Sequence, residues 1–117
     1  KIALTNSAPS ASNTILADIT QISATGGYTA GAGGGYSVTV TWSEASGTAK
    51  LVITDKTITA SGGSVGPFRY VVLYNDSATS PADALIGWWD YGSALTLADT
   101  ESLLLDLDDT GGVFTIT

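Results

Sequence analysis

Apolar and polar residues alternate along several short segments of this 117-residue chain. The clearest segment is YSVTVTW at residues 36–42, in which Ser and Thr alternate with four larger side chains, Tyr36, Val38, Val40 and Trp42. A period of two is typical of an antiparallel strand with one buried face. The pattern therefore predicts a strand over 36–42 and favours a place in the core for Trp42.

The segment RYVVLY at residues 69–74 has a different pattern. Tyr70, Val72 and Tyr74 point to one side of an extended chain, and Val71 and Leu73 point to the other. A strand that is apolar on both sides is expected between two covering layers or around a closed core. We therefore expect a central strand here, with these five side chains largely buried.

Shorter apolar or β-branched segments, separated by Gly, Pro, Asn, Asp and Ser, predict the remaining strands. No long window repeats its apolar positions with the spacing of a helix. The turn segment 75–83 and the loop 108–112 are expected to separate strands, the latter as a tight hairpin between the last two strands. The other strands are expected at 1–5, 14–22, 49–54, 56–60, 84–89, 94–97, 101–107 and 113–117.

This spacing predicts an all-β fold: one antiparallel β-sandwich or barrel, jelly-roll or immunoglobulin-like, with about eight to nine short strands. The length suits a single domain over residues 1–117. Glycine dominates residues 26–35, but a phosphate-binding loop needs a helix after it and a Lys within it. A strand is expected to begin at Tyr36 instead, so this stretch is predicted to be a flexible connection.

Composition excludes many kinds of site. The chain has no Cys and no His, so disulfides, thiolate or imidazole metal sites and a Ser-His-Asp triad are excluded. Its net charge is −7, and four basic residues are too few for a surface that follows phosphates. No apolar run is long enough to cross a bilayer. We therefore expect a protein without enzymatic activity or cofactor, and without a nucleic-acid or membrane partner.

Acidic residues cluster near the C-terminus. Asp106, Asp108 and Gly111 match the first, third and sixth positions of a calcium loop, but Thr117 occupies the twelfth, where Glu is required. The favoured interpretation is an ordinary turn, and the other is a weakly held surface cation near Asp106, Asp108 and Asp109. Acid–base catalysis by carboxylates such as Asp99 and Glu101 is a third, disfavoured hypothesis.

Four consecutive residues form the candidate interface: Trp88, Trp89, Asp90 and Tyr91. Adjacent residues of a strand point to opposite faces, so one Trp is expected to point inward and the other outward. An exposed Trp beside Tyr can stack on a sugar ring or bind a protein neighbour. The alternative is that one Trp belongs to the core and the other lies under a loop.

Three segments resemble a family of small structural proteins of tailed bacteriophages. They are LADITQISATGGYTAG at 16–31, SVGPFRYVVLYNDSATSPADALIGWWDYGS at 64–93 and GVFTIT at 112–117. The resemblance covers nearly the whole chain and is most specific in the middle segment. Members of that family usually begin some twenty residues earlier, so the resemblance also implies a further segment before Lys1.

The resemblance implies a virion protein that is assembled in the host cytoplasm in many copies. The favoured role is capsid decoration, in which a cement protein on the outer head surface binds the major capsid protein or other virion proteins. Such proteins usually act as homo-oligomers, often trimers. The alternatives are a component of the tail or fibre, and a carbohydrate-binding module that uses Trp88 and Trp89.

Overall fold

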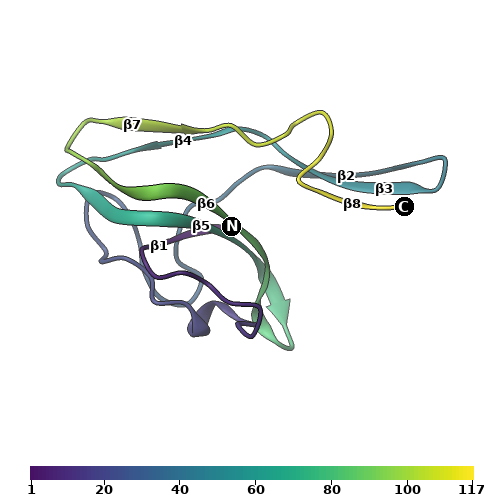
Figure 1. Cartoon of the computed structure of the whole chain (residues 1–117), viewed down its shortest axis with the longest axis horizontal. Coiled ribbons are helices and arrows are strands. Elements are labelled where there is room, and N and C mark those ends of the chain that lie inside the picture. The colour runs from purple at the N-terminus through teal and green to yellow at the C-terminus, as the bar shows by residue number, and fades with distance from the viewer. The chain divides into compact units, whose positions relative to one another are not determined.

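Strands make up most of the ordered secondary structure in the computed structural model, which describes residues 1–117 (Figure 1). The only helix is η1, a single 3-10 turn over Leu16–Asp18. The strands are β1 Ile2–Thr5, β2 Val40–Ala45, β3 Thr48–Ile53, β4 Lys56–Thr59, β5 Val65–Thr79, β6 Ala82–Leu97, β7 Ser102–Leu105 and β8 Phe114–Ile116. The predicted all-β class is confirmed.

The strands form three sheets, with the orders β1-β5-β6, β2-β3-β8 and β4-β7. Both three-stranded sheets are antiparallel. The chain divides into two compact units. Unit 1 comprises residues 1–37 and 59–101 and contains β1, η1, β5 and β6. Unit 2 comprises residues 38–58 and 102–117 and contains the other strands, except that Thr59 at the end of β4 belongs to unit 1.

Strand β5 is the centre of unit 1, as its apolar pattern predicts. It pairs with β1 on one side and β6 on the other, so that Val72 lies between Ala3 and Trp88. Every side chain from Val71 to Tyr74 is buried, and so is every residue of β1. Tyr70 is only partly buried, because its row of the sheet ends at the exposed Asp90.

The segment 14–22 was expected to be a strand, and that expectation is wrong. A carboxylate oxygen of Asp18 accepts the backbone N–H groups of Thr14 and Ile15, at 2.7 and 3.2 Å. Such local hydrogen bonds compete with strand pairing and favour a turn. The resulting helix η1 places Leu16 in a cluster of buried side chains with Ala3 and Tyr74.

Other boundaries also differ from the sequence-based expectations. Strand β2 begins at Val40, not at residue 36, and β5 continues through most of the expected turn segment 75–83. The segments expected as separate strands at 84–89 and 94–97 both belong to β6. The last two strands do not form a hairpin, because β7 pairs with β4 and β8 pairs with β3.

The glycine-rich stretch 26–35 is packed into unit 1, contrary to the expectation of a flexible connection. Within it the Tyr28 side chain is 3% exposed and its hydroxyl accepts the backbone N–H of Leu4. Gly35 has a φ of +82°, and a Cβ there would collide with the carbonyl oxygen of Ile2. Glycine is required because Ile2 and Tyr36 exchange two backbone hydrogen bonds beside it.

Unit 2 has a smaller core of its own. Its buried apolar side chains are Leu51, Ile53, Ile58 and Leu107. The backbone N–H of Leu107 donates to the Asp55 carboxylate at 2.8 Å, which ties the loop after β7 to the turn between β3 and β4. These four side chains account for the buried apolar residues of the unit.

Replacement of Val72 by Asp is expected to unfold unit 1. Val72 is 0% exposed, and an unpaired buried carboxylate costs several kcal/mol against a total stability of about 5–15 kcal/mol. The measurement is thermal unfolding followed by circular dichroism. The control is Ile86→Asp, on the same sheet but 47% exposed, which should change the melting temperature little. An unchanged melting temperature for Val72→Asp would contradict the central position of β5.

Candidate functional site

The residues that the sequence singled out as an interface lie on strand β6. We call Trp88, Trp89, Asp90 and Tyr91 the β6 surface. Trp88 is 42% exposed, Trp89 37% and Tyr91 58%, so neither Trp is a buried core residue. The alternative in which one Trp belongs to the core is therefore wrong.

The reason is the position of β6 at the edge of its sheet. Trp89 pairs with Val71 and Trp88 with Val72, and these small valines on the central strand fill the interior. The two indole rings extend from opposite faces of the sheet, because adjacent strand residues alternate. Each ring is thus half covered by its own sheet and half available to a partner, and the two rings do not form a single platform.

An ion pair holds the end of this surface in place. Arg69 binds Asp90 with two hydrogen bonds, Nε to Oδ1 at 2.7 Å and the guanidinium Nη2 to Oδ2 at 2.8 Å. The guanidinium carbon also lies 5.3 Å from the ring centroid of Tyr70. The hydrogen bonds from Arg69, and a further one from the Gly92 amide, lower the pKa of the Asp90 carboxyl. Sequence analysis selected Asp90 but not its partner Arg69.

The Asp90 carboxylate also shapes the backbone that presents Tyr91. On β5 and β6, Tyr70 pairs with Asp90, and the next pair is Phe68 with Leu95. The four residues of β6 between these pairs therefore lie opposite a single residue of β5, Arg69. The extra residues on one strand form a β-bulge within 90–93. Asp90 Oδ1 accepts the Gly92 N–H at 2.7 Å inside the bulge, where Gly92 has a φ of +93°.

A second exposed apolar surface lies in unit 2, on one face of the sheet β2-β3-β8. We call its four exposed side chains the Trp42 face: Val40, Trp42, Phe114 and Ile116. Trp42 is 58% exposed, so its expected place in the core is wrong. The alternation of apolar and polar residues in β2 and β8 indicated which side chains share a face, but it could not indicate whether another layer covers that face.

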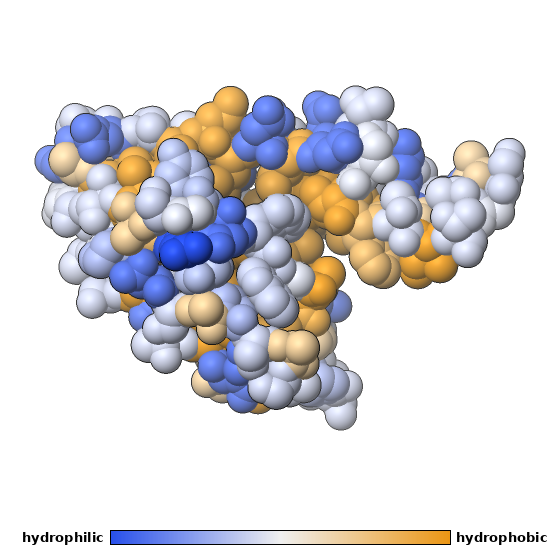
Figure 2. All heavy atoms as spheres, in the orientation of Figure 1, coloured by the Kyte–Doolittle hydropathy of each residue, from blue (hydrophilic) through white to orange (hydrophobic).

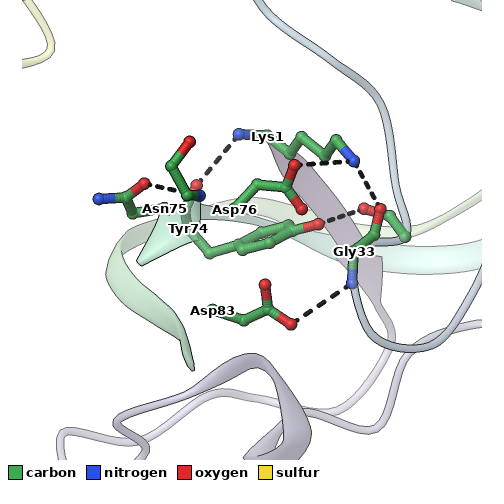
Figure 3. A network of polar contacts seen from close by, with 8 residues as sticks. Lys1, Gly33, Tyr74, Asn75, Asp76 and Asp83 are labelled. Carbon is green, nitrogen blue, oxygen red and sulfur yellow. Dashed lines mark hydrogen bonds and ion pairs between the residues drawn. The ribbon is translucent and has the colours of Figure 1, made fainter. Parts of the chain in front are cut away.

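The third cluster is a network of polar contacts in unit 1, drawn in Figure 3. The Lys1 ammonium lies 3.0 Å from an Asp76 carboxylate oxygen and donates to the carbonyl of Gly33 at 2.7 Å. The Tyr74 hydroxyl donates to the carbonyl of Gly34, and burial raises the pKa of this hydroxyl. All these contacts fasten the glycine-rich stretch to strands β1 and β5, which explains why that stretch is packed.

A surface pocket of about 370 Å³ lies beside the same stretch. Two of the residues that line it carry functional polar groups, Gln21 and Asp83. Gln21 already donates to the Gly31 carbonyl and accepts the Tyr28 hydroxyl, while Asp83 accepts the Gly33 N–H at 3.4 Å. The polar groups therefore organise the loop, and the pocket presents no pair of acid and base side chains.

Among the acidic residues near the C-terminus, Asp108 binds backbone amides of its own turn. Asp108 accepts the N–H groups of Thr110 and Gly111, which lower the pKa of its carboxyl, with the Gly111 bond as the main cause. No group of three or more acidic side chains is arranged to hold a metal ion, at Asp106, Asp108 and Asp109 or elsewhere. The loop is a turn stabilised by an Asp side chain.

The carboxylates considered for acid–base chemistry are engaged in the same way. Asp99 accepts the Gly62 N–H at 2.8 Å, and Glu101 accepts the Ala98 N–H at 2.7 Å. Glu101 thus binds its own turn, whereas Asp99 joins two segments that lie 37 residues apart in the sequence.

Comparison with family models, with curated proteins and with solved structures found no match to this chain. None of the structure's helices has the length and apolar character required to span a membrane.

Titration of Asp90 tests the ion pair with Arg69. Because its pKa is lowered in the folded state, Asp90 stabilises the fold above the pKa of an unfolded Asp, near 3.9, and this contribution is lost as the pH falls through the folded-state value. Carboxyl-carbon NMR should give a midpoint below 3.9. The variant Arg69→Gln should raise that midpoint, and an unchanged midpoint would contradict the role assigned to Arg69.

Proposed function

We propose that this chain is a non-enzymatic structural protein of a tailed-bacteriophage virion, and specifically a capsid decoration protein on the outer surface of the head. The observation that carries the proposal is that large apolar side chains are exposed in groups along strands. Isolated exposed apolar residues are ordinary on a soluble protein, but contiguous groups typically mark contact surfaces. The resemblance of residues 16–31, 64–93 and 112–117 to phage structural proteins supports the same role.

In this proposal the β6 surface binds the major capsid protein. Trp and Tyr are enriched among the residues that dominate protein interfaces, since each buries a large area at low entropic cost. Trp88 and Trp89 extend from opposite faces of an edge strand, so a partner that encloses this edge contacts both rings. The Arg69–Asp90 pair fixes the backbone in advance, which reduces the entropy lost on binding.

A decoration protein also stabilises the head by mass action, because it binds the expanded shell in preference to other states. Many weak contacts of this kind add together on a symmetric particle. We include in the proposal the finer architecture expected from the strand spacing, a jelly-roll or immunoglobulin-like sandwich. The three observed sheets supply the strands for such an arrangement.

The direct test is quantitative mass spectrometry of purified virions of the phage that encodes this chain. We expect hundreds of copies per particle in whole virions. Preparations of tails without heads should lack the chain. Purified protein should also bind expanded heads, and Trp89→Ala should weaken that binding about 30-fold, the effect of a residue that dominates an interface. Thr96→Ala, an exposed residue of the same strand, is the control. Absence of the chain from virions would refute the proposal, whereas its presence in tails alone would assign it to the tail or fibre.

Binding of carbohydrate is the competing function, because an exposed Trp can stack on a sugar ring. Trp88 and Trp89 lie on opposite faces of the sheet, so the two rings cannot form one stacking surface for a sugar. We therefore expect no tight binding of sugars. Calorimetric titration with a panel of oligosaccharides is the measurement. Tight binding that Trp89→Ala abolishes would replace the structural role by that of a carbohydrate-binding module.

A further inference from the structure

The sheet β2-β3-β8 is apolar on one face and polar on the other. Its apolar face is built from three rows of paired residues: Val40 with Ile53, Trp42 with Leu51 and Phe114, and Glu44 with Ala49 and Ile116. Its other face carries Thr41, Ser43, Ala45, Thr48, Lys50, Val52 and Thr115. An apolar sheet face is normally covered by a second layer.

The middle row forms the centre of the apolar face. The rings of Trp42 and Phe114 stand edge to face, with centroids 6.4 Å apart and an angle of 87° between their planes. They come from the two outer strands and meet above Leu51, which is 5% exposed on the central strand. We call the Trp42–Phe114 pair the aromatic ridge; edge-to-face packing orients the two rings, and both remain partly exposed. Figure 2 shows hydrophobic side chains at the surface of the molecule in this part of the chain.

The four residues of the Trp42 face remain between 43% and 58% exposed. These fractions correspond to roughly 400 Å² of apolar side-chain surface, the size of the largest apolar patch on a typical monomer. The patch is also continuous along the sheet, because all four residues lie on the same face of adjacent rows. A continuous apolar face of this size is a candidate contact surface.

We infer that the Trp42 face packs against the Trp42 face of a second copy of this chain, around a two-fold axis that passes near the ring pair. This inference does not rest on the proposed role in the virion, since it follows from the sheet alone.

The exposed area is close to what such a dimer needs. Homodimer interfaces are about 65% apolar, so roughly 400 Å² of apolar surface corresponds to about 600 Å² per copy. Two copies then bury about 1,200 Å², the lower limit for a specific protein interface. An interface at this lower limit is typical of a dimer that dissociates on dilution.

The distribution of charge sets the orientation of the two copies. Glu44 is the only ionisable side chain on this face and lies in the last row, two rows from Val40. Antiparallel stacking of the sheets places the two Glu44 carboxylates at opposite ends of the interface, each beside the β2–β3 turn where it accepts the Gly47 N–H. It also brings the two aromatic ridges together at the axis, as an interface between identical surfaces requires.

The test is the mass of the purified chain in solution as a function of concentration, measured by analytical ultracentrifugation. We expect a monomer–dimer equilibrium for the natural sequence. Trp42→Glu should increase the dimer dissociation constant at least 30-fold. Thr41→Glu, the neighbouring residue on the polar face, should leave the constant unchanged. Circular dichroism of each variant verifies that it is folded.

Charge complementation tests the two-fold arrangement directly. Trp42→Lys and Trp42→Glu should each be monomeric alone and should form a heterodimer when mixed, because the two side chains at position 42 meet at the axis. A second probe is a variant that keeps Trp42 as its only Trp, through Trp88→Phe and Trp89→Phe. Its emission should shift to longer wavelength on dilution, as the indole becomes exposed to water.

Either of two results would overturn the inference. The first is a natural chain that stays monomeric up to about 1 mM, a concentration at which even weak specific dimers form. The second is a dimer that persists unchanged in folded Trp42→Glu, which would place the contact elsewhere. Virion composition is measured separately, so failure of the decoration proposal and failure of the dimer are distinguishable.

Discussion

Pairing of β5 with strands on both sides is the constraint on which unit 1 depends. The segment Val71–Tyr74 is apolar in both directions, so it can be stable only where both faces are covered and both edges are hydrogen-bonded. Strand β1 meets this requirement on one edge and is itself fully buried. Strand β6 meets it on the other edge, and because it ends the sheet it carries the half-exposed rings of Trp88 and Trp89. The buried centre and the exposed aromatic edge therefore have a common origin.

The sequence allowed the all-β class and the central strand to be predicted, because both depend on local alternation. It did not allow prediction of η1, where the Asp18 carboxylate binds the Thr14 and Ile15 amides and replaces strand pairing. Nor did it allow the partners of β7 and β8 to be assigned, since pairing between distant strands depends on the whole chain. The packed glycine stretch was missed for the same reason, because Lys1 and Tyr74 hold it from other strands.

The candidate site was predicted in part. Trp88 to Tyr91 stood out because adjacent residues of a strand point to opposite faces, so at least one Trp was expected to be exposed, and the structure exposes all three aromatic residues. Arg69 gave no signal of its own, since only the pairing of β5 with β6 brings it to Asp90. Trp42 was misplaced because alternation defines the two faces of a strand without showing which is covered. The structure supplies that information, because Val40, Trp42, Phe114 and Ile116 are each between 43% and 58% exposed.

The acidic character of the chain and its apolar surfaces act at different distances. A net charge of −7 keeps separate copies apart, but it is screened beyond about 8 Å at physiological ionic strength. Apolar contact acts only where surfaces meet. The carboxylates of Asp90, Asp99 and Asp108 bind Arg69 or nearby backbone amides, so they do not interrupt either apolar surface. Charge therefore governs how copies interact at a distance, and the exposed apolar faces govern which contacts are favourable once surfaces meet.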